Sequence, residues 1–289
     1  MIARLMMGVR VAFGLHQPGR NLRVFPDDIF IVSFPKSGNT WTRFLLANLV
    51  YPEANPDFTN INSIIPDPEA LTKRRLNALP RPRIIKSHQY FDPRYNKVIY
   101  VVRDPRDVAL SQYHFHRKRT LIGDDYPVLR FVERFVRGET SPYASWGENV
   151  AGWLATRYGR SGFLLLRYED MIADTGRELA KVADFLGLPA DAQRLSAAVR
   201  RSSADRIREL EKMQARKWSS TRNTRQDIPF VRTGKAGNWQ SGLPAEAVAL
   251  LENTWGPLMH WLGYETTHEQ NAETADARLL PAILGHHRA

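Results

Sequence analysis

Three short segments of the chain place charged or hydrogen-bonding side chains directly after apolar runs of strand length. The first is PKSGNTW at 35–41, which follows the apolar run 29–34 and leads into a helical pattern. A strand, a tight glycine-containing turn and a helix N-terminus together present backbone N–H groups and the positive end of the helix dipole to an anion. The side chains that add charge or donors are those of Lys36, Ser37, Asn39 and Thr40. The segment predicts a phosphate-binding turn, with an ordinary strand-to-helix turn as the alternative.

This segment is not the nucleotide-binding sequence GxxxxGK[ST]. In that sequence the lysine follows the last glycine, whereas here Lys36 precedes Gly38. The difference weakens any analogy with enzymes that bind ATP and Mg²⁺.

The second segment is VIYVVRDPRDVALS at 98–111, in which Arg103 directly follows an apolar run. Open α/β sheets bind ligands at the carboxyl ends of their strands. Arg103, together with Ser111 about two turns into the next helix, is therefore a candidate for holding a second phosphate.

Two other readings of the second segment stay open. In one, the neighbouring arginines and aspartates form only surface ion pairs, Arg103–Asp107 and Arg106–Asp104, which contribute little. In the other, Asp104 ends its strand and holds Mg²⁺, although Arg103 beside it disfavours that.

The third segment is RIIKSH at 83–88, where Lys86 and His88 follow another apolar run. A neutral histidine, with an ordinary pKa near ~6.5, is a common general base for a hydroxyl nucleophile. A histidine that is only hydrogen-bonded in a loop is the alternative.

The elements that must position these residues alternate between strand and helix. Strands are predicted at 29–34, 83–86, 98–102 and 163–167, and helices at 40–50, 105–117 and 174–186. Asp174 is a predicted N-cap, and Gly187 a predicted C-terminal stop. The alternation predicts an α/β fold whose mostly parallel central sheet is flanked by helices on both faces. The polar stretches 52–82 and 121–149 are predicted lids or binding loops.

Composition narrows the class of protein. The 289 residues are 43% hydrophobic and 25% charged and include no cysteine, which favours one large soluble domain over a disordered or disulfide-stapled chain. We expect that domain to span 1–265, followed by a tail at 266–289 that is disordered or docked. No run reaches the ~20 apolar residues of a membrane span, and 1–20 lacks a signal-peptide pattern. A packed N-terminal helix and a cytoplasmic location are expected, and membrane contact is not predicted.

The net charge of +11 is concentrated late in the chain. Between 200 and 235 there are eleven Lys and Arg residues and four acidic ones, which gives that segment a charge of +7. Such a run is compatible with a solvated helix face, an anionic ligand or a nucleic acid.

Taken together, these three segments resemble motifs of the sulfotransferases that use 3′-phosphoadenosine 5′-phosphosulfate (PAPS). The segment 35–41 is similar to the family's 5′-phosphosulfate loop, 100–111 to its 3′-phosphate motif, and 86–88 to the strand end that carries its catalytic base. The sequence LRYED at 166–170 resembles a further family element, and RTGKAGNW at 232–239 the late RKGxxGDWK motif. These five elements span most of the chain. The resemblance also implies a three-layer sandwich of the P-loop NTPase type with lid insertions.

The resemblance implies a role for each matching residue. Lys36 would neutralise the leaving phosphate, Lys86 would help bind the sulfuryl oxygens, and His88 would accept the proton of the acceptor hydroxyl. The residues implied to bind PAPS, or its product 3′-phosphoadenosine 5′-phosphate (PAP), are Lys36, Ser37, Gly38, Asn39, Thr40, Trp41, Arg103, Ser111, Tyr168, Ser202, Arg232, Thr233 and Gly234, with Ser203 as an alternative to Ser202. Trp41 would stack on adenine. Transfer would be in line to a small-molecule, sugar or lipid hydroxyl, or to an amine, with no metal required.

The chain departs from the family pattern at several positions. Asn39 replaces the usual threonine, Thr233 stands where the family has lysine, and Asn238 and Gln240 replace Asp and Lys of the GDWK sequence. The change at Thr233 removes one phosphate contact and predicts a lower cofactor affinity. The family's KxxTVxxE dimer segment is absent after this motif, so no oligomeric state is predicted.

Two other functions are compatible with parts of the sequence. One is a Mg²⁺-dependent phosphotransferase of the nucleotide-kinase type, which the position of Lys36 disfavours. The other is a basic nucleic-acid binder, which would interleave aromatic and basic residues over a surface instead of grouping charge near one late loop. The basic segment at 200–235 is instead expected to close over a polyanionic cofactor, with 213–233 as a mobile lid.

Overall fold

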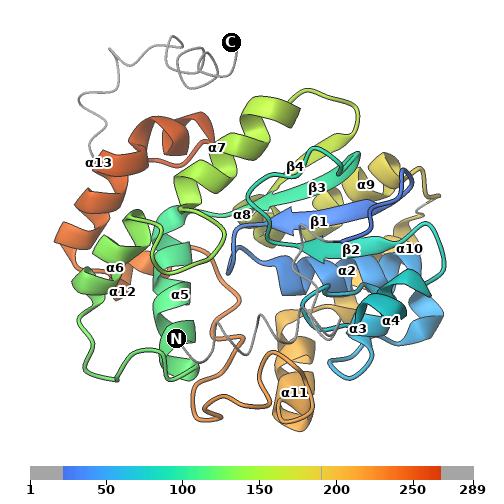
Figure 1. Ribbon diagram of the computed structural model, residues 1–289, viewed down its shortest axis with the longest axis horizontal. Helices are drawn as coiled ribbons and strands as arrows, with labels where there is room; N and C mark the ends of the chain where they lie inside the picture. Colours follow the sequence, from blue (N-terminus) through green and yellow to red (C-terminus); the bar gives the residue numbers. More distant parts are fainter. Residues whose placement is uncertain (1–21, 190, 268–289) are drawn as a thin grey trace.

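A computed structural model describes residues 22–189 and 191–267, and the predicted N-terminal helix and most of the predicted tail lie outside this range. Its centre is a sheet of four parallel strands, β1 (Ile29–Ser33), β2 (Ile84–Ser87), β3 (Lys97–Val102) and β4 (Phe163–Arg167), in the order β2-β1-β3-β4. All four predicted strands are confirmed to within about one residue at each end. The first strand lies inside the sheet, so the carboxyl ends of β1, β2 and β3 meet along one edge (Figure 1).

Helices connect and cover these strands. In chain order they are α2 (Asn39–Val50), the 3₁₀ turn η2 (Pro52–Ala54), α3 (Ile61–Ile64), α4 (Lys73–Asn77), α5 (Pro105–Lys118), α6 (Val128–Val136), α7 (Trp146–Arg157), α8 (Tyr168–Ala173), α9 (Thr175–Leu186), α10 (Ala192–Arg201), α11 (Ala204–Gln214), α12 (Trp239–Gly242) and α13 (Ala245–Trp261). The predicted caps of α9 are confirmed: Asp174 accepts the Arg177 N–H, and Gly187 adopts the left-handed conformation at the C-terminal end.

The strands are buried on both faces, because successive side chains point to opposite sides. Phe30 and Val32 belong to a core that contains residues of α5, α6, α7 and α13. Ile31 between them belongs to a second core, built with α2, α8, α9 and α10. Two cores on either side of one parallel sheet form the predicted three-layer α/β sandwich, visible in Figure 1 as helices above and below the strands.

The predicted insertions contain more helix than the sequence patterns indicated. The stretch 121–149 includes α6 and the start of α7, and 52–82 includes η2, α3 and α4. Ser145 begins α7 with a reciprocal cap, in which its hydroxyl accepts the Glu148 N–H and the Glu148 carboxylate accepts the Ser145 N–H. In the described part of the chain, no helix combines the length and apolar character needed to span a bilayer.

Candidate active site

A cavity of about 700 Å³ opens at the carboxyl edge of the sheet. It is bounded by the turn between β1 and α2, the ends of β2 and β3, the start of α5, and a segment near 219–234. The predicted site residues that line it are Lys36, Gly38, Asn39, Thr40, Trp41, Lys86, His88, Arg103, Ser111, Tyr168, Arg232, Thr233 and Gly234. The remaining two, Ser37 and Ser202, are fully buried behind the wall. Residues from all five motifs thus share one cavity.

The turn between β1 and α2 depends on a residue without a Cβ. Gly38 has a φ of 101°, and a Cβ built there would lie 2.5 Å from Cδ2 of Tyr168. Gly38 therefore permits both the close packing of Tyr168 and the turn that places the start of α2, Asn39 and Thr40, at the cavity. The side chain of Asn39 was expected to contact phosphate, but its amide donates to the Ile31 carbonyl and the Ser33 hydroxyl, both at 3.2 Å. What Asn39 offers at the start of the helix is its backbone N–H.

The ammonium group of Lys36 lies between two aromatic rings. Its Nζ is 3.9 Å from the ring centre of Phe230 and 4.5 Å from that of Phe115. Burial and the nearby positive charges of Arg103 and Arg232 lower the pKa of Lys36 to about 7. Lys36 is therefore partly uncharged at neutral pH until an anion enters the cavity.

The imidazole of His88 is held in one orientation by the end of β1. Its Nδ1 is 2.7 Å from the carbonyl oxygen of Ser33. A carbonyl oxygen can only accept, so we infer that Nδ1 carries the proton and that Nε2 has a free lone pair. Burial, followed by the charge of Lys86, lowers the pKa of His88 to about 3. The histidine is neutral at physiological pH, as a general base must be.

Lys86 is paired with a carboxylate that the sequence analysis did not identify. Its Nζ lies 2.6 Å from Oδ2 of Asp67, which comes from the insertion between α3 and α4. Burial opposes ionisation of Asp67, but the charges of Lys86 and Arg43 outweigh it and hold its pKa well below the ordinary value. Arg43 is also buried, lines the cavity and donates to the Ile65 carbonyl. No local pattern marks Asp67, because only the fold brings it to Lys86.

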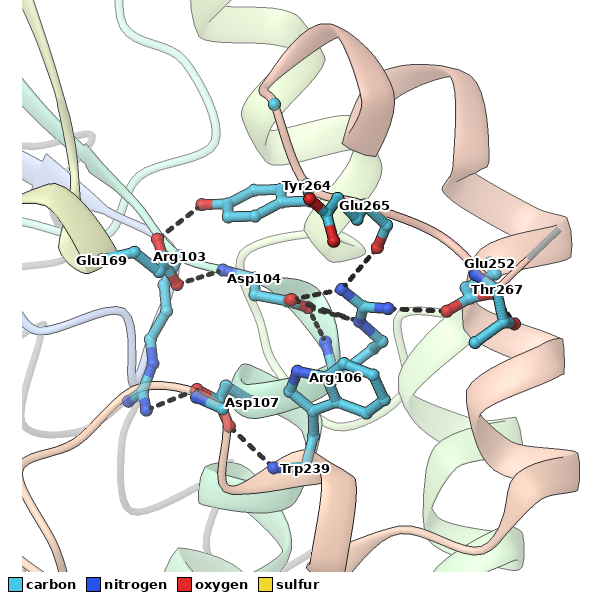
Figure 2. A network of polar contacts seen from close by, with 12 residues as sticks. Arg103, Asp104, Arg106, Asp107, Glu169, Trp239, Glu252, Tyr264, Glu265 and Thr267 are labelled. Carbon is cyan, nitrogen blue, oxygen red and sulfur yellow. Dashed lines mark hydrogen bonds and ion pairs between the residues drawn. The ribbon is translucent and has the colours of Figure 1, made fainter. Parts of the chain in front are cut away.

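The two ion pairs considered from the sequence do form, but they are buried and not on the surface. Arg103 pairs with Asp107 at 3.1 Å and Arg106 with Asp104 at 2.7 Å, and in each pair both side chains are at least nine-tenths buried. Figure 2 shows how a wider network holds them. The interpretation as weak surface pairs is wrong because α13 and the end of the described chain cover this region.

The same network fixes the late glycine-containing motif to the second segment. The carboxylate of Asp107 accepts the backbone N–H groups of Trp239 (Figure 2) and Gly237. Arg103 donates to the Lys235 carbonyl at 3.1 Å. This places Arg232, Thr233 and Gly234 on the cavity wall. Asp104 was considered as a Mg²⁺ ligand, but its carboxylate is used in hydrogen bonds to Arg106. Both oxygens accept from the Arg106 guanidinium, and one also accepts the Arg106 backbone N–H at the start of α5.

Trp41 and Tyr168 form an aromatic wall. Their ring centres are 5.7 Å apart in an edge-to-face arrangement, and the indole N–H of Trp41 donates to the Ser202 carbonyl at 2.9 Å. The hydroxyl of Ser202 accepts from Asn48 at 3.0 Å. Ser202 therefore holds Trp41 and α2 in place without lining the cavity.

Several buried polar atoms near the cavity have no hydrogen-bond partner within the described residues. They include the Ser37 hydroxyl and Nε of Arg103. Ser37 lies behind the cavity wall, but Arg103 lines the cavity, so its unpaired donor fits a ligand rich in acceptor oxygens, since leaving such a group unpaired is costly. Within the described ranges, no group of three or more His, Asp or Glu side chains is arranged to hold a metal ion.

Comparison with known proteins gives the family. A family model described as the sulfotransferase domain matches residues 26–263. Rat (Rattus norvegicus) sulfotransferase 1C2 is 32% identical over 75% of this chain and 77% of its own length, and zebrafish (Danio rerio) cytosolic sulfotransferase 1 is 30% identical over 77% and 79%. The chain therefore belongs to the PAPS-dependent sulfotransferase family, as its motifs predicted, and is an enzyme of that class.

Solved structures agree in fold. A retinol dehydratase in complex with androsterone and the inactive cofactor PAP aligns with a TM-score of 0.68 and 24% identity, covering 83% of this chain and 82% of that one. Mouse sulfotransferase SULT7A1 complexed with PAP aligns with a TM-score of 0.66 and 20% identity, covering 92% and 90%. The predicted α/β class is confirmed.

Proposed function

We propose that this enzyme transfers the sulfuryl group of PAPS in line to a hydroxyl, or an amine, of a small-molecule acceptor, with His88 as base and Lys36 stabilising the leaving phosphate. The observation that carries the proposal is the convergence of Lys36, His88 and Arg103 on one cavity from the ends of three different strands. PAP in the solved relatives supports the same cofactor here.

The cofactor would occupy the positively charged side of the cavity. Backbone N–H groups at the start of α2 and the ammonium of Lys36 would hold the 5′ end. Arg103, Ser111, Arg232 and Gly234 would hold the 3′-phosphate, and the wall made by Trp41 and Tyr168 would contact adenine. The unpaired Nε of Arg103 offers a donor that is free for a phosphate oxygen.

PAPS supplies a sulfuryl group already activated by its bond to phosphate. The protein must position the cofactor and the acceptor, stabilise the developing charge and provide a proton acceptor. The free Nε2 of His88 would take the proton of the acceptor hydroxyl, because the hydrogen bond from Nδ1 to Ser33 fixes the tautomer. Lys36, protonated once the anionic cofactor is bound, would leave its position over Phe115 and Phe230 and stabilise the negative charge that develops on the leaving phosphate.

We also propose a class of acceptor and a cellular compartment for this enzyme. A retinol dehydratase has been solved in complex with androsterone and in complex with retinol, so small hydroxylated molecules are the acceptor class we propose. The cytosolic relatives support a cytoplasmic location.

The experiment that tests this mechanism replaces His88 by asparagine. We expect transfer of radiolabelled sulfuryl groups to fall at least about 100-fold, the usual contribution of a general base. PAP affinity, measured by isothermal titration calorimetry, should change less than about threefold. Retention of most activity would show that another group accepts the proton, and failure of the unsubstituted enzyme to bind PAP would reject the proposed cofactor.

A further inference from the structure

Beside His88, the cavity is lined by a hydrogen-bonded pair of side chains, Glu69 and Tyr143. We infer that the acceptor is a neutral polyol, such as a sugar ring, whose hydroxyls beside the reacting one are bound by Glu69 and Tyr143; this rests on the proposed function. The alternative classes, a flat phenol or a sterol with a single hydroxyl, would require an apolar surface at this end.

The cavity lining includes six hydrogen-bonding side chains that the proposed cofactor contacts do not use. They are Asp67, Glu69, Gln112, Thr140, Ser141 and Tyr143. An apolar acceptor would leave these polar groups without water or partners, which is unfavourable.

Apart from Tyr143, the large aromatic side chains of the cavity pack against groups other than His88. Phe115 and Phe230 are stacked against the ammonium of Lys36, and Trp218 packs on Phe230 with ring centres 4.8 Å apart. Trp41 and Tyr168 form the separate wall beside Gly38. Both groups lie on the side that the cofactor would occupy, and the aromatic ring beside His88 is that of Tyr143, whose hydroxyl is polar.

Glu69 and Tyr143 are held together at the His88 end. The Tyr143 hydroxyl donates to the Glu69 carboxylate, and the Tyr143 ring centre lies 5.6 Å from that of His88. Asn149 fixes this arrangement, because its amide donates to the backbone carbonyls of Tyr143 at 3.0 Å and of His88 at 3.4 Å. A hydroxyl that reaches Nε2 of His88 would therefore have the Glu69–Tyr143 pair beside it.

The carboxylate of Glu69 has capacity left for a ligand. It takes part in no ion pair within the described residues, whereas Asp67, two residues earlier, is paired with Lys86. A carboxylate has about four acceptor positions, and Tyr143 occupies one of them. Adjacent hydroxyls of a polyol would donate to the others.

The charge of the cavity favours a neutral acceptor over an amine. Seven Lys and Arg residues line it, against two acidic ones. A cationic acceptor would be repelled by this excess before the cofactor binds. Neutral hydroxyls can use the carboxylate without that cost.

The test compares acceptors that differ in the hydroxyls beside the reacting one. The probes are myo-inositol and hexyl β-glucoside as polyols, and cyclohexanol and 2-naphthol as acceptors with one hydroxyl. Radiolabelled transfer from PAPS gives kcat/KM for each. We expect the polyols to be preferred over cyclohexanol by at least about tenfold, because a site built to bind hydroxyls rejects analogues that lack them.

Variants at Glu69 then identify the contact. Glu69→Leu should lower kcat/KM for the polyols by about 10- to 100-fold and leave 2-naphthol within about threefold. Glu69→Gln keeps an acceptor oxygen and should retain most of the activity. Glu246→Leu makes the same change on α13, outside the cavity lining, and should have no effect. PAP binding by calorimetry should be equal in all of these proteins.

The outcomes separate the two proposals. Loss of PAP binding in the unsubstituted enzyme would reject the proposed function itself. PAP binding together with a preference for 2-naphthol or cyclohexanol, or with no transfer to either polyol, would overturn only the acceptor inference. An equal loss with every acceptor in Glu69→Leu would assign Glu69 a structural role and would also overturn it.

Discussion

At the scale of single residues, burial lowers the pKa of both Lys36 and His88, with different consequences for the proposed chemistry. A pKa of about 3 keeps His88 uncharged at every pH at which the enzyme is expected to work, so its base is always available. A pKa of about 7 leaves Lys36 only partly charged before the cofactor arrives. An anionic ligand must therefore restore the charge on Lys36, which links binding to a proton.

This linkage gives a prediction for Lys36. At pH 8 the free side chain is mostly neutral, and a phosphate beside it raises its pKa, so binding of PAP should take up about one proton. At pH 6 the Lys36 side chain is already protonated in the free enzyme, so binding of PAP should cause no proton uptake by Lys36. Calorimetry in buffers of different ionisation enthalpy measures the proton number.

Lys36→Met is the matched variant, since it keeps the length of the side chain and removes the titrating group. It should bind PAP without proton uptake at pH 8 and more weakly than the unsubstituted enzyme. If uptake at pH 8 persists in this variant, the proton belongs to another group. If the unsubstituted enzyme shows none, Lys36 is fully charged in the free cavity.

The sequence predicted the residues that follow strands but not those that come from insertions. Lys36, His88 and Arg103 each stand directly after an apolar run, so strand pattern and position located them before the fold was known. Asp67 and Glu69 lie in an irregular stretch between α3 and α4, where no periodicity indicates which side chains turn inward. Their place beside Lys86 and His88 depends on tertiary contacts alone.

At the scale of elements, apolar runs predicted the strands well and amphipathic patterns predicted fewer than half of the helices. β1 to β4, α2, α5 and α9 were predicted, because strands buried on both faces are continuous apolar runs. α6, α7 and α13 were not, although they form much of the core on one face of the sheet. The pattern is weak in α7 and in α13, which contains Pro257. α6 is strongly amphipathic, but it lies in the stretch 121–149 that was interpreted as a lid or binding loop.

The turn that leads into α2 yields a prediction with a built-in control. Gly38→Ala adds a Cβ at a φ of 101° and 2.5 Å from Tyr168, whereas Gly159→Ala adds one at a φ of 76° with nothing within 4 Å. Backbone strain alone costs about 1–2 kcal/mol. We expect Gly38→Ala to cost at least about 1 kcal/mol more in urea unfolding than Gly159→Ala and to weaken PAP binding at least about tenfold. Equal unfolding costs with unchanged PAP binding would mean that Tyr168 moves aside freely.

The expected lid at 213–233 is tied to its surroundings by two buried charges. The Lys118 ammonium donates to the carbonyls of Arg225 at 2.8 Å and Ile228 at 2.6 Å. The Glu211 carboxylate accepts the N–H groups of Phe230 and Val231. Any movement of this segment must therefore break charge-assisted hydrogen bonds, which are among the stronger ones in proteins.

Removing one of these ties should loosen the segment measurably. We expect Lys118→Met to speed amide hydrogen exchange across 225–231 by about tenfold or more, since losing hydrogen bonds to a charged group costs about 1.5 kcal/mol or more. Added PAP should slow exchange across 213–233 in the unsubstituted enzyme. Lys181→Met, which removes a half-exposed pair on α9, is the control and should leave this segment unchanged. Exchange insensitive to both Lys118→Met and PAP would rule out a lid here.

At the scale of the whole molecule, one buried network connects the cavity to the end of the described chain. Arg106 pairs with Asp104 at the start of α5 and with Glu252 of α13, and it donates to the Glu265 carbonyl (Figure 2). Glu252 in turn accepts from Thr267. The network thus fastens the last described residues to the strand end that carries Arg103, and they are part of the same folded unit.

The sequence placed the end of the folded domain at 265, and the contacts of 264–267 give a prediction that tests this boundary. A chain that ends at Thr267 keeps every contact described above, and its melting temperature should stay within about 2 °C of the full chain. A chain that ends at Gly263 loses Tyr264, which is 5% exposed and hydrogen-bonded to Glu169, together with the partners of Arg106 and Glu252. Losing a buried aromatic side chain costs about 3 kcal/mol or more, which corresponds to roughly 6–12 °C. Calorimetric melting of both truncated chains and of full-length Tyr264→Ala measures these effects, and a large loss in the chain ending at Thr267 would show that residues after 267 belong to the domain.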